Sequence, residues 1–282
     1  MKIAHLILAH RDLAQVARLV KQIAHPGSFV VIHIDKKCDM QGFLELEKQP
    51  DVYLMKNRID VNWGGYSIVE ATINGLRAIV ELRREFDFVN LISGQDYPIK
   101  PIAEFNALLE ENKGKCFFNY CLPGEPWLEE AQQKINTYNL TDWKLKGKYA
   151  LQKLLNIALP KRTAPAGYTV IGFSAWFTID AEATRYILKC CDDKLPITGF
   201  FKYSWGSDEM FFQTLIYNSP LKDKMVNHNY RYIDWSEKNP RPKTLTMADA
   251  PALKASDAFF ARKFDQDAEV LDYIDQNLLS NS

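Results

Sequence analysis

Two apolar stretches, IAHLILA at residues 3–9 and FVVIHI at residues 29–34, indicate the fold of this protein. Each is an uninterrupted hydrophobic run of strand length, which is typical of a strand buried on both faces. Between them, apolar residues recur at helical spacing from Leu13 to Ala24. A buried strand, a helix and a second buried strand form a βαβ unit, so we expect an α/β protein.

Further strands are predicted at residues 52–55, 88–92, 169–178 and 231–235, and Ser67 and Ser207 are candidate helix caps. Ligands of open α/β sheets bind beyond the carboxyl ends of the strands. Those ends carry polar or glycine residues in the first half of the chain: His10-Arg11, Asp35-Lys36, Trp63-Gly64 and Ser93-Gly94-Gln95-Asp96. Because polar loops occur there in any α/β domain, the pattern predicts a ligand-binding edge without naming its ligand.

The composition restricts the classes of function. Lys plus Arg and Asp plus Glu number 35 each, so no net charge favours nucleic acid or a membrane. The 5 cysteines include no CxxC pair, which predicts free thiols and a reducing compartment. No apolar stretch has the length of a membrane-spanning helix. We therefore expect a cytoplasmic protein with no nucleic-acid partner.

Several motifs that would define other chemistries are absent. The sequence contains no GxxxxGK[ST] loop, no GxGxxG fingerprint and no GxSxG elbow. The DxD triplet with which many nucleotide-sugar transferases hold a divalent metal does not follow any predicted strand, because its one occurrence is Asp265-Gln266-Asp267. His5 and His10 are poorly spaced along a strand to share one ion. We expect no metal and no other cofactor.

A set of motifs in sequence order resembles the core-2/I-branching family, which contains branching β-1,6-N-acetylglucosaminyltransferases and peptide O-xylosyltransferases. Each motif is short, but together they extend across nearly the whole chain. The motifs are IHIDKK at 32–37, WGGYS at 63–67, SGQDYP at 93–98, GFSAWF at 172–177, SDE at 207–209 and FARKF at 260–264. The resemblance implies a GT-A-like α/β fold with a mixed central sheet flanked by helices. It also implies an inverting, metal-independent transfer from a UDP-sugar.

The resemblance further implies which residues bind the donor. Asp35 matches an acidic residue that contacts the uridine, and Trp63 matches an aromatic residue of the donor site. Ser174, Ala175 and Trp176 match the lining of the sugar side.

Other matched residues are charged. Glu209 matches the catalytic base, and Arg262 and Lys263 match a basic pair beside the diphosphate. A further basic residue upstream is expected to assist them, with Arg241 as first choice and Lys243 as second. Two strand-end residues are predicted to support the site: His10, and Asp96 as an orienting hydrogen-bond acceptor.

The chemistry of an inverting transfer explains these residue types. The acceptor hydroxyl needs a base, and Glu209 follows the candidate cap Ser207, where a helix dipole would favour its ionised form. Without a metal, the leaving diphosphate needs fixed cations, and arginine binds phosphate oxygens bidentately. The alternative interpretations are ordinary first-turn acids at 208–209 and a surface basic pair at a helix end at 262–263.

We expect a single glycosyltransferase domain over residues 1–282. It would comprise a nucleotide-binding half (1–120), an inserted acceptor-side flap (121–168) and a catalytic and diphosphate-binding half (169–282). Residues 128–165 look irregular, and they are basic through Lys134, Lys144, Lys146, Lys148, Lys153, Lys161 and Arg162. The insertion is either merely solvated or a flap that favours acidic glycans or an anionic membrane, with peripheral contact through 134–162.

The expected reaction transfers GlcNAc or xylose from its UDP-sugar to a glycan or a lipid-linked saccharide in β-linkage. The family's animal members carry a membrane anchor and many disulfides, so the chain looks like a bacterial member, placed in the cytoplasm or peripherally on the inner face of the membrane. Two alternatives remain open. One is a sugar nucleotidyltransferase, although residues 9–15 offer no glycine-rich loop, and the other is a non-catalytic glycan-binding module.

Overall fold

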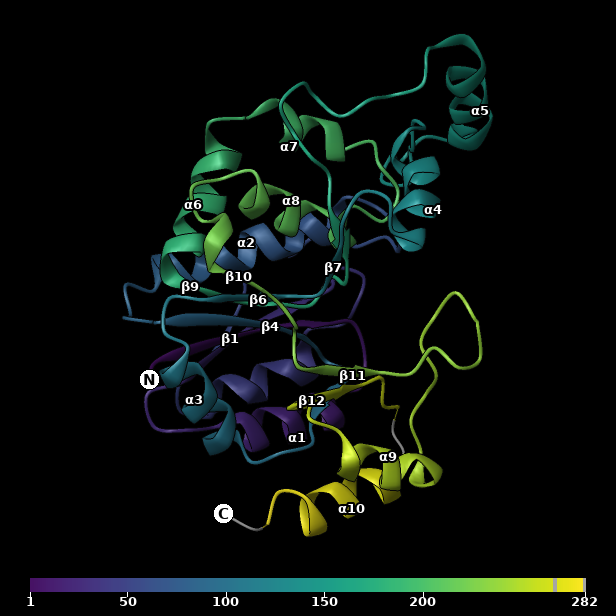
Figure 1. The fold of residues 1–282 in the computed structure, drawn as a ribbon. Coiled ribbons are helices and arrows are strands. Elements are labelled where there is room, and N and C mark those ends of the chain that lie inside the picture. The colour runs from purple at the N-terminus through teal and green to yellow at the C-terminus, as the bar shows by residue number, and fades with distance from the viewer. Residues whose placement is uncertain (266–267, 281–282) are drawn as a thin grey trace.

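The computed structural model describes residues 1–265 and 268–280, which form an α/β fold around a seven-stranded sheet (Figure 1). The strand order is β10-β6-β9-β4-β1-β2-β3. Strand β9 runs antiparallel to both of its neighbours, whereas the other neighbouring pairs are parallel. The predicted mixed central sheet is therefore confirmed. Its strands are β1 (Ile3–Ala9), β2 (Phe29–Ile34), β3 (Val52–Leu54), β4 (Phe88–Ser93), β6 (Cys116–Phe118), β9 (Thr178–Asp180) and β10 (Met225–Asn227).

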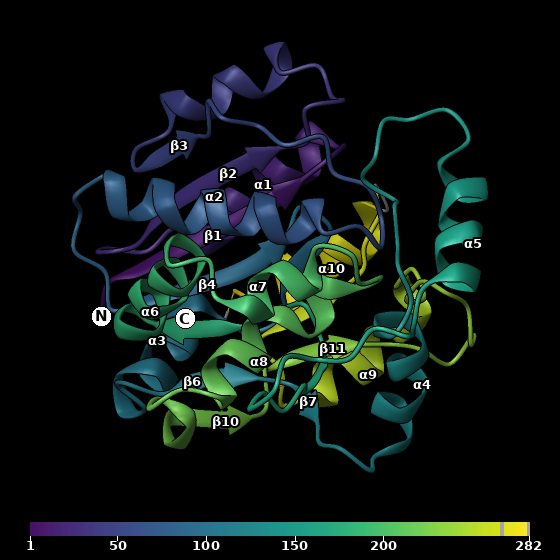
Figure 2. The ribbon, with the colours of Figure 1, turned by 90° about the horizontal axis from the view of Figure 1, so that it is seen from above.

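Helices cover both faces of the sheet (Figures 1 and 2). Successive side chains of a strand point to opposite faces, so Ala4 and Leu6 of β1 join one hydrophobic core while Ile3 and Ile7 join the other. The first face packs against α2 (Ser67–Glu81), α6 (Ala181–Asp192), α7 (Pro196–Phe201) and α8 (Phe211–Tyr217). The second packs against α1 (Leu13–Ile23), α3 (Ile102–Glu111), α9 (Ala250–Ala255) and α10 (Ala268–Asn277).

Two small sheets complete the arrangement beside the large one. The first has the order β11-β12-β5, with β11 (Arg231–Ile233), β12 (Phe260–Arg262) and β5 (Asp96–Pro98). Strands β12 and β5 are antiparallel, and their register places Arg262 opposite Asp96. The second pairs β7 (Tyr120–Cys121) with β8 (Gly172–Phe173).

Two predicted elements differ from the structure. The single strand expected at 169–178 is instead β8 followed by β9, with residues 174–177 forming the connection between them. The insertion, expected to be irregular, contains the helices α4 (Pro126–Ile135) and α5 (Lys148–Ala158). Distant contacts hold the break at 174–177, since Gln213 and Asn229 donate to Ser174. In contrast, α5 has no buried residue, and its side-chain hydrogen bonds connect it to the nearby residues 138–141.

The insertion is anchored to the rest of the protein by buried or partly buried polar contacts. The carboxylate of Asp142 accepts hydrogen bonds from the backbone N–H (3.0 Å) and the hydroxyl (2.6 Å) of Ser67. Asp142 thus caps α2, whereas Ser67, the predicted cap, is the first residue of that helix. Arg162 is buried and donates to the hydroxyl of Ser204 at 3.1 Å and to the carbonyl of Phe200, both outside the insertion. Arg162 is therefore a structural anchor and not part of an exposed basic surface.

Within residues 1–265 and 268–280, no helix combines the length and apolar character needed to cross a bilayer.

Candidate functional site

The loop that carries Trp63 lies against the turn that carries Glu209. The indole of Trp63, 55% exposed, meets the ring of Trp205 edge-on at a centroid distance of 5.1 Å. The backbone N–H of Gly206 donates to the carbonyl of Gly64 at 2.9 Å. A Cβ on Gly64 would lie 2.5 Å from the indole nitrogen of Trp205, so only glycine fits this approach. The predicted donor-site aromatic residue and the predicted base therefore belong to one packed unit.

The sequence predicts that Glu209 lies in the first turn of an α-helix. In the structure it does not. Residues Ser207–Glu209 form one 3₁₀ turn, and α8 begins two residues later at Phe211. The hydroxyl of Ser207 donates to the carbonyls of Phe201 (2.7 Å) and Ser204 (2.9 Å), so it does not cap a helix. The prediction that a helix dipole keeps Glu209 ionised is wrong.

The surroundings of Glu209 favour its protonated form, which is opposite to the predicted effect of a helix dipole. Burial raises the pKa of Glu209, and the adjacent Asp208 raises it further. Burial likewise raises the pKa of Asp208, while Arg262 lowers it. Lys134, in α4 of the insertion, lowers the pKa of Glu209 and places its ammonium 4.7 Å from the ring centre of Trp205. The sequence predicts Lys134 only as part of a basic segment, because no motif or spacing along the chain places it near Glu209.

Arg262 occupies the centre of the predicted diphosphate region. It ends strand β12 instead of lying at a helix end, and its Nε is 3.1 Å from Oδ1 of the buried Asp96. Its guanidinium carbon lies 4.2 Å from the ring centre of Trp176, within the range of a cation–π contact. Asp96 also accepts a hydrogen bond from the backbone N–H of Ser93 at 3.0 Å. Asp96 and Trp176 thus hold the guanidinium from two sides.

Lys263 lies among other cations. Burial lowers its pKa, and Arg241, Arg11 and Arg262 lower it further, whereas Asp265 raises it. Arg241 places its guanidinium carbon 6.0 Å from the ring centre of Trp63. Arg11, which the sequence placed only at a strand end, joins this group. A cluster of positive charges that depresses the pKa of one of its own members favours the binding of an anion.

Lys243, the second choice for the additional cation, is engaged elsewhere. Its ammonium lies 2.6 Å from the carboxylate of Asp249 and 3.8 Å from that of Asp234. Arg241 has no comparable ion pair among the described residues.

Asp35 and His10 lie at the carboxyl ends of β2 and β1. Asp35 is 5% exposed and accepts a hydrogen bond from the backbone N–H of Lys37 at 2.9 Å. Partial burial lowers the pKa of His10, as do Arg11 and Arg262, while Asp35 raises it. The first two strand ends thus come close to the cation group, as expected for a ligand-binding edge.

The segment Ser174–Trp176 is held in place by its polar contacts. The hydroxyl oxygen of Ser174 accepts hydrogen bonds from the side-chain amide of Asn229 (3.1 Å) and the backbone N–H of Trp176 (3.3 Å). Ala175 and Trp176 are partly exposed. The break between β8 and β9 lets Trp176 reach Arg262.

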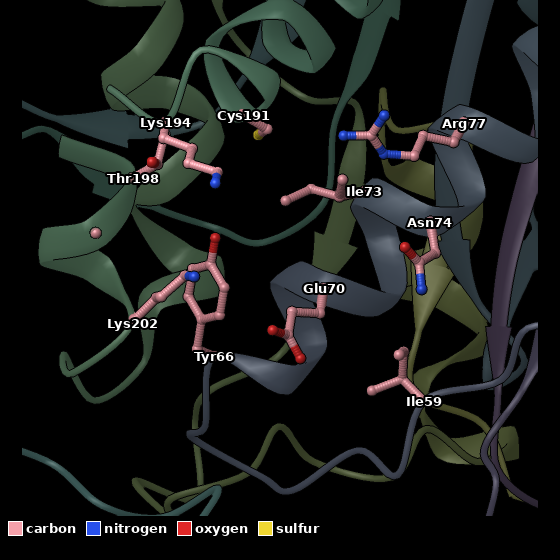
Figure 3. Close-up of a pocket in the computed structure, with 11 residues that line it drawn as sticks. Ile59, Tyr66, Glu70, Ile73, Asn74, Arg77, Cys191, Lys194, Thr198 and Lys202 are labelled. Carbon is pink, nitrogen blue, oxygen red and sulfur yellow. The ribbon is translucent and has the colours of Figure 1, made fainter. Parts of the chain in front are cut away.

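A cleft of about 440 Å³ lies between α2 and residues 191–202 (Figure 3). Tyr66, Glu70 and Arg77 line it from the α2 side, and Lys194 and Lys202 from the facing segment. None of its 11 lining residues is a predicted site residue. The cleft is therefore not part of the predicted site. Among the described residues, no group of three or more His, Cys, Asp or Glu side chains is arranged to hold a metal ion.

Comparison with known proteins identifies the family. A sequence model of the Core-2/I-branching enzyme family matches residues 3–257, so this chain belongs to that family of glycosyltransferases. Xylosyltransferase 2 from the dog is 26% identical over 309 residues, covering 99% of this chain and 34% of the relative. Xylosyltransferase 1 from the rat is 26% identical over 305 residues, covering 100% and 36%. The chain thus spans about a third of the length of these relatives.

Among solved structures, mouse xyloside xylosyltransferase 1 in its apo form aligns with a TM-score of 0.43 at 10% identity, covering 92% of this chain and 97% of that one.

Proposed function

We propose that this protein is an inverting, metal-independent glycosyltransferase that moves a sugar from a UDP-sugar to a hydroxyl of a glycan or lipid-linked saccharide in β-linkage. The observation that carries the proposal is the juxtaposition of two charge groups at one edge of the fold. The acids Asp208 and Glu209 stand on one side and the cations around Lys263 on the other, with Arg262 interacting with both groups. Family membership and the similarity to xylosyltransferases support the same reaction class.

The proposed reaction is a direct displacement at the anomeric carbon. Glu209 takes the proton of the acceptor hydroxyl as its oxygen forms a bond to that carbon. The bond from the anomeric carbon to the β-phosphate oxygen breaks, and its electron pair leaves with UDP. A base with a raised pKa is better suited to accept a proton from a hydroxyl, because proton transfer is most efficient when the pKa is near the working pH. Lys134 offsets the negative charge that Asp208 adds beside Glu209.

The cations have a complementary task in the proposal. Lys263, Arg241 and Arg262 balance the charge that grows on UDP as the bond breaks, which is the work a divalent metal performs in other transferases. Asp96 positions Arg262, Trp63 and Trp176 border the sugar nucleotide, and Asp35 binds the uridine. UDP-GlcNAc and UDP-xylose are the two donors that the family suggests.

The test is a UDP-release assay over a panel of sugar nucleotides, in the presence of EDTA, with the wild-type protein and the variant Glu209→Gln. UDP release from one donor, dependent on Glu209 and insensitive to EDTA, is the expected result. Release of pyrophosphate from UTP and a sugar 1-phosphate would instead indicate a nucleotidyltransferase. Binding to a glycan array without UDP release from any donor would indicate a glycan-binding module.

A further inference from the structure

The segment 143–162 exposes an unusual share of the large apolar side chains. Of the 12 large hydrophobic residues that the described structure exposes, 6 fall within positions 143–159. The most exposed are Ile157 (73%), Tyr149 (64%) and Leu154 (59%), and all three belong to α5. The others are Trp143, Leu145 and Leu159. Such a concentration on one short segment marks an interaction surface, whereas scattered exposed hydrophobic residues do not.

The helix α5 has a partly buried inner face and an exposed outer face. Residues 148, 151, 152 and 155 are partly buried, and this spacing places them on the inner face. Gln152 accepts a hydrogen bond from the backbone N–H of Leu140 at 2.9 Å, which attaches that face to the protein. Tyr149, Lys153, Leu154 and Ile157 are exposed on the outer face. Figures 1 and 2 both show α5 at the margin of the molecule, away from the central sheet.

The charged residues of the segment itself are all positive. Residues 143–162 contain no Asp or Glu. Lys144 is paired with Asp60 at 2.8 Å, and Lys148 donates to the carbonyl of Thr141 at 2.5 Å. In the part of the chain that the structure describes, three exposed lysines of the segment form neither ion pairs nor hydrogen bonds through their side chains. These are Lys146, Lys153 and Lys161.

We propose that the outer face of α5, together with the exposed residues that flank it, docks onto the surface of an anionic phospholipid bilayer. Apolar side chains that include Tyr and Trp, bordered by unpaired lysines, are the combination that inserts shallowly between anionic headgroups. An acidic polysaccharide would engage the lysines but would leave Leu154 and Ile157 in water. The same insertion supplies Lys134 beside Glu209, so docking through α5 brings the proposed acceptor side of the site to the membrane.

The proposal concerns the placement of the enzyme and goes beyond its proposed reaction. Vesicle binding requires no sugar nucleotide, so it is measured independently of whether UDP release is observed.

The experiment is co-sedimentation of the intact protein with vesicles of phosphatidylcholine, with and without phosphatidylglycerol. We expect binding only to the phosphatidylglycerol vesicles, weakened by added salt because exposed charges are screened. The double variant Leu154→Glu/Ile157→Glu should bind at least tenfold more weakly. Lys146→Ala/Lys153→Ala should lose about fivefold per lysine, the equivalent of the attraction of one lysine to an anionic surface.

The matched control is Leu44→Glu, which replaces an exposed leucine (47%) in the 3₁₀ helix Gln41–Lys48, outside the insertion. It should bind vesicles as the wild type does, and all variants should keep the wild-type melting temperature within about 2 °C because only exposed side chains change.

Binding to heparin that survives in Leu154→Glu/Ile157→Glu, together with weakened vesicle binding, supports the proposal. Absence of vesicle binding by the wild type overturns it, as does equal binding to uncharged vesicles. Vesicle binding that Leu154→Glu/Ile157→Glu leaves unchanged also overturns it. The proposal is also overturned if light scattering finds a wild-type dimer that the Leu154→Glu/Ile157→Glu change dissociates, since a second copy would then cover this face.

Discussion

Replacement of Lys263 by alanine should lower turnover without lowering stability. Burial and three arginines, Arg241, Arg11 and Arg262, act against the charge of Lys263, whereas Asp265 favours it without lying within ion-pair distance. The variant therefore removes a repulsive charge from the free protein, and we expect an unchanged or slightly higher melting temperature. In the donor complex it removes one charge-assisted hydrogen bond to phosphate, worth roughly 1.5–3 kcal/mol, or one to two decades.

The loss should appear in kcat as well as in donor affinity, because charge on the UDP oxygens grows as the glycosidic bond breaks. Arg262→Ala provides the contrast. It leaves the buried carboxylate of Asp96 without its closest cation, and breaking a buried ion pair costs about 3–5 kcal/mol. Arg262→Ala should therefore lower the melting temperature strongly, whereas Lys263→Ala should not.

The assay is steady-state UDP release at saturating donor, paired with thermal unfolding of each variant with and without UDP. UDP should stabilise the wild type more than Lys263→Ala. If both variants kept near-normal kcat, these two residues would not hold the diphosphate, and Arg241→Ala would be the next variant to measure.

Other outcomes follow from the same geometry. Glu209→Gln should abolish transfer, with a loss of about 10²–10⁴ in rate, and leave UDP affinity within a few-fold; a variant that kept more than half of wild-type turnover would refute its role as base. The kcat/KM should fall as the pH drops through the pKa of Glu209, which lies well above the 4.5 of an ordinary glutamate. Burial and Asp208 favour the protonated form of Glu209, which cannot act as base. An acidic limb near pH 4.5 in the pH profile would contradict this. Transfer should survive EDTA, and a rate that falls to background and returns with manganese would show that the cations do not replace a metal. Asp142→Ala should lower kcat and the melting temperature together, because it uncaps α2 and releases the loop of Trp63. Asp142→Asn should restore part of both. Normal kinetics for Asp142→Ala would exclude a positioning role for Asp142.

Strands β1 to β4 and the family were predictable from the sequence, since the runs at 3–9 and 29–34 form strands in any context that buries them. The three-residue strands β6 and β10 were not predicted. Nor was the environment of Glu209. The sequence places an apparent cap before two acids and an apolar run, which is how a helix usually begins. The hydroxyl of Ser207 instead bonds to carbonyls of residues 201 and 204, and a 3₁₀ turn results. The partners of Glu209 and Lys263 were equally hidden, because Lys134 and Arg11 come from segments far away along the chain.

The placement of charge at the proposed site determines which substrate we expect to bind first. The free protein separates its charges, with Asp208 and Glu209 on one side and the cations around Lys263 on the other. A bound diphosphate would lie against the cations and relieve their mutual repulsion, so the site gains more from the donor than from a neutral ligand of the same shape. The cations also offset the charge of the diphosphate, which would otherwise raise the pKa of Glu209 further and favour the protonated form that cannot act as base. Because this gain from the donor does not require the acceptor, we expect the donor to bind first. Initial-rate kinetics with UDP as product inhibitor test this order: UDP should compete with the donor and not with the acceptor, and competition with the acceptor would refute it.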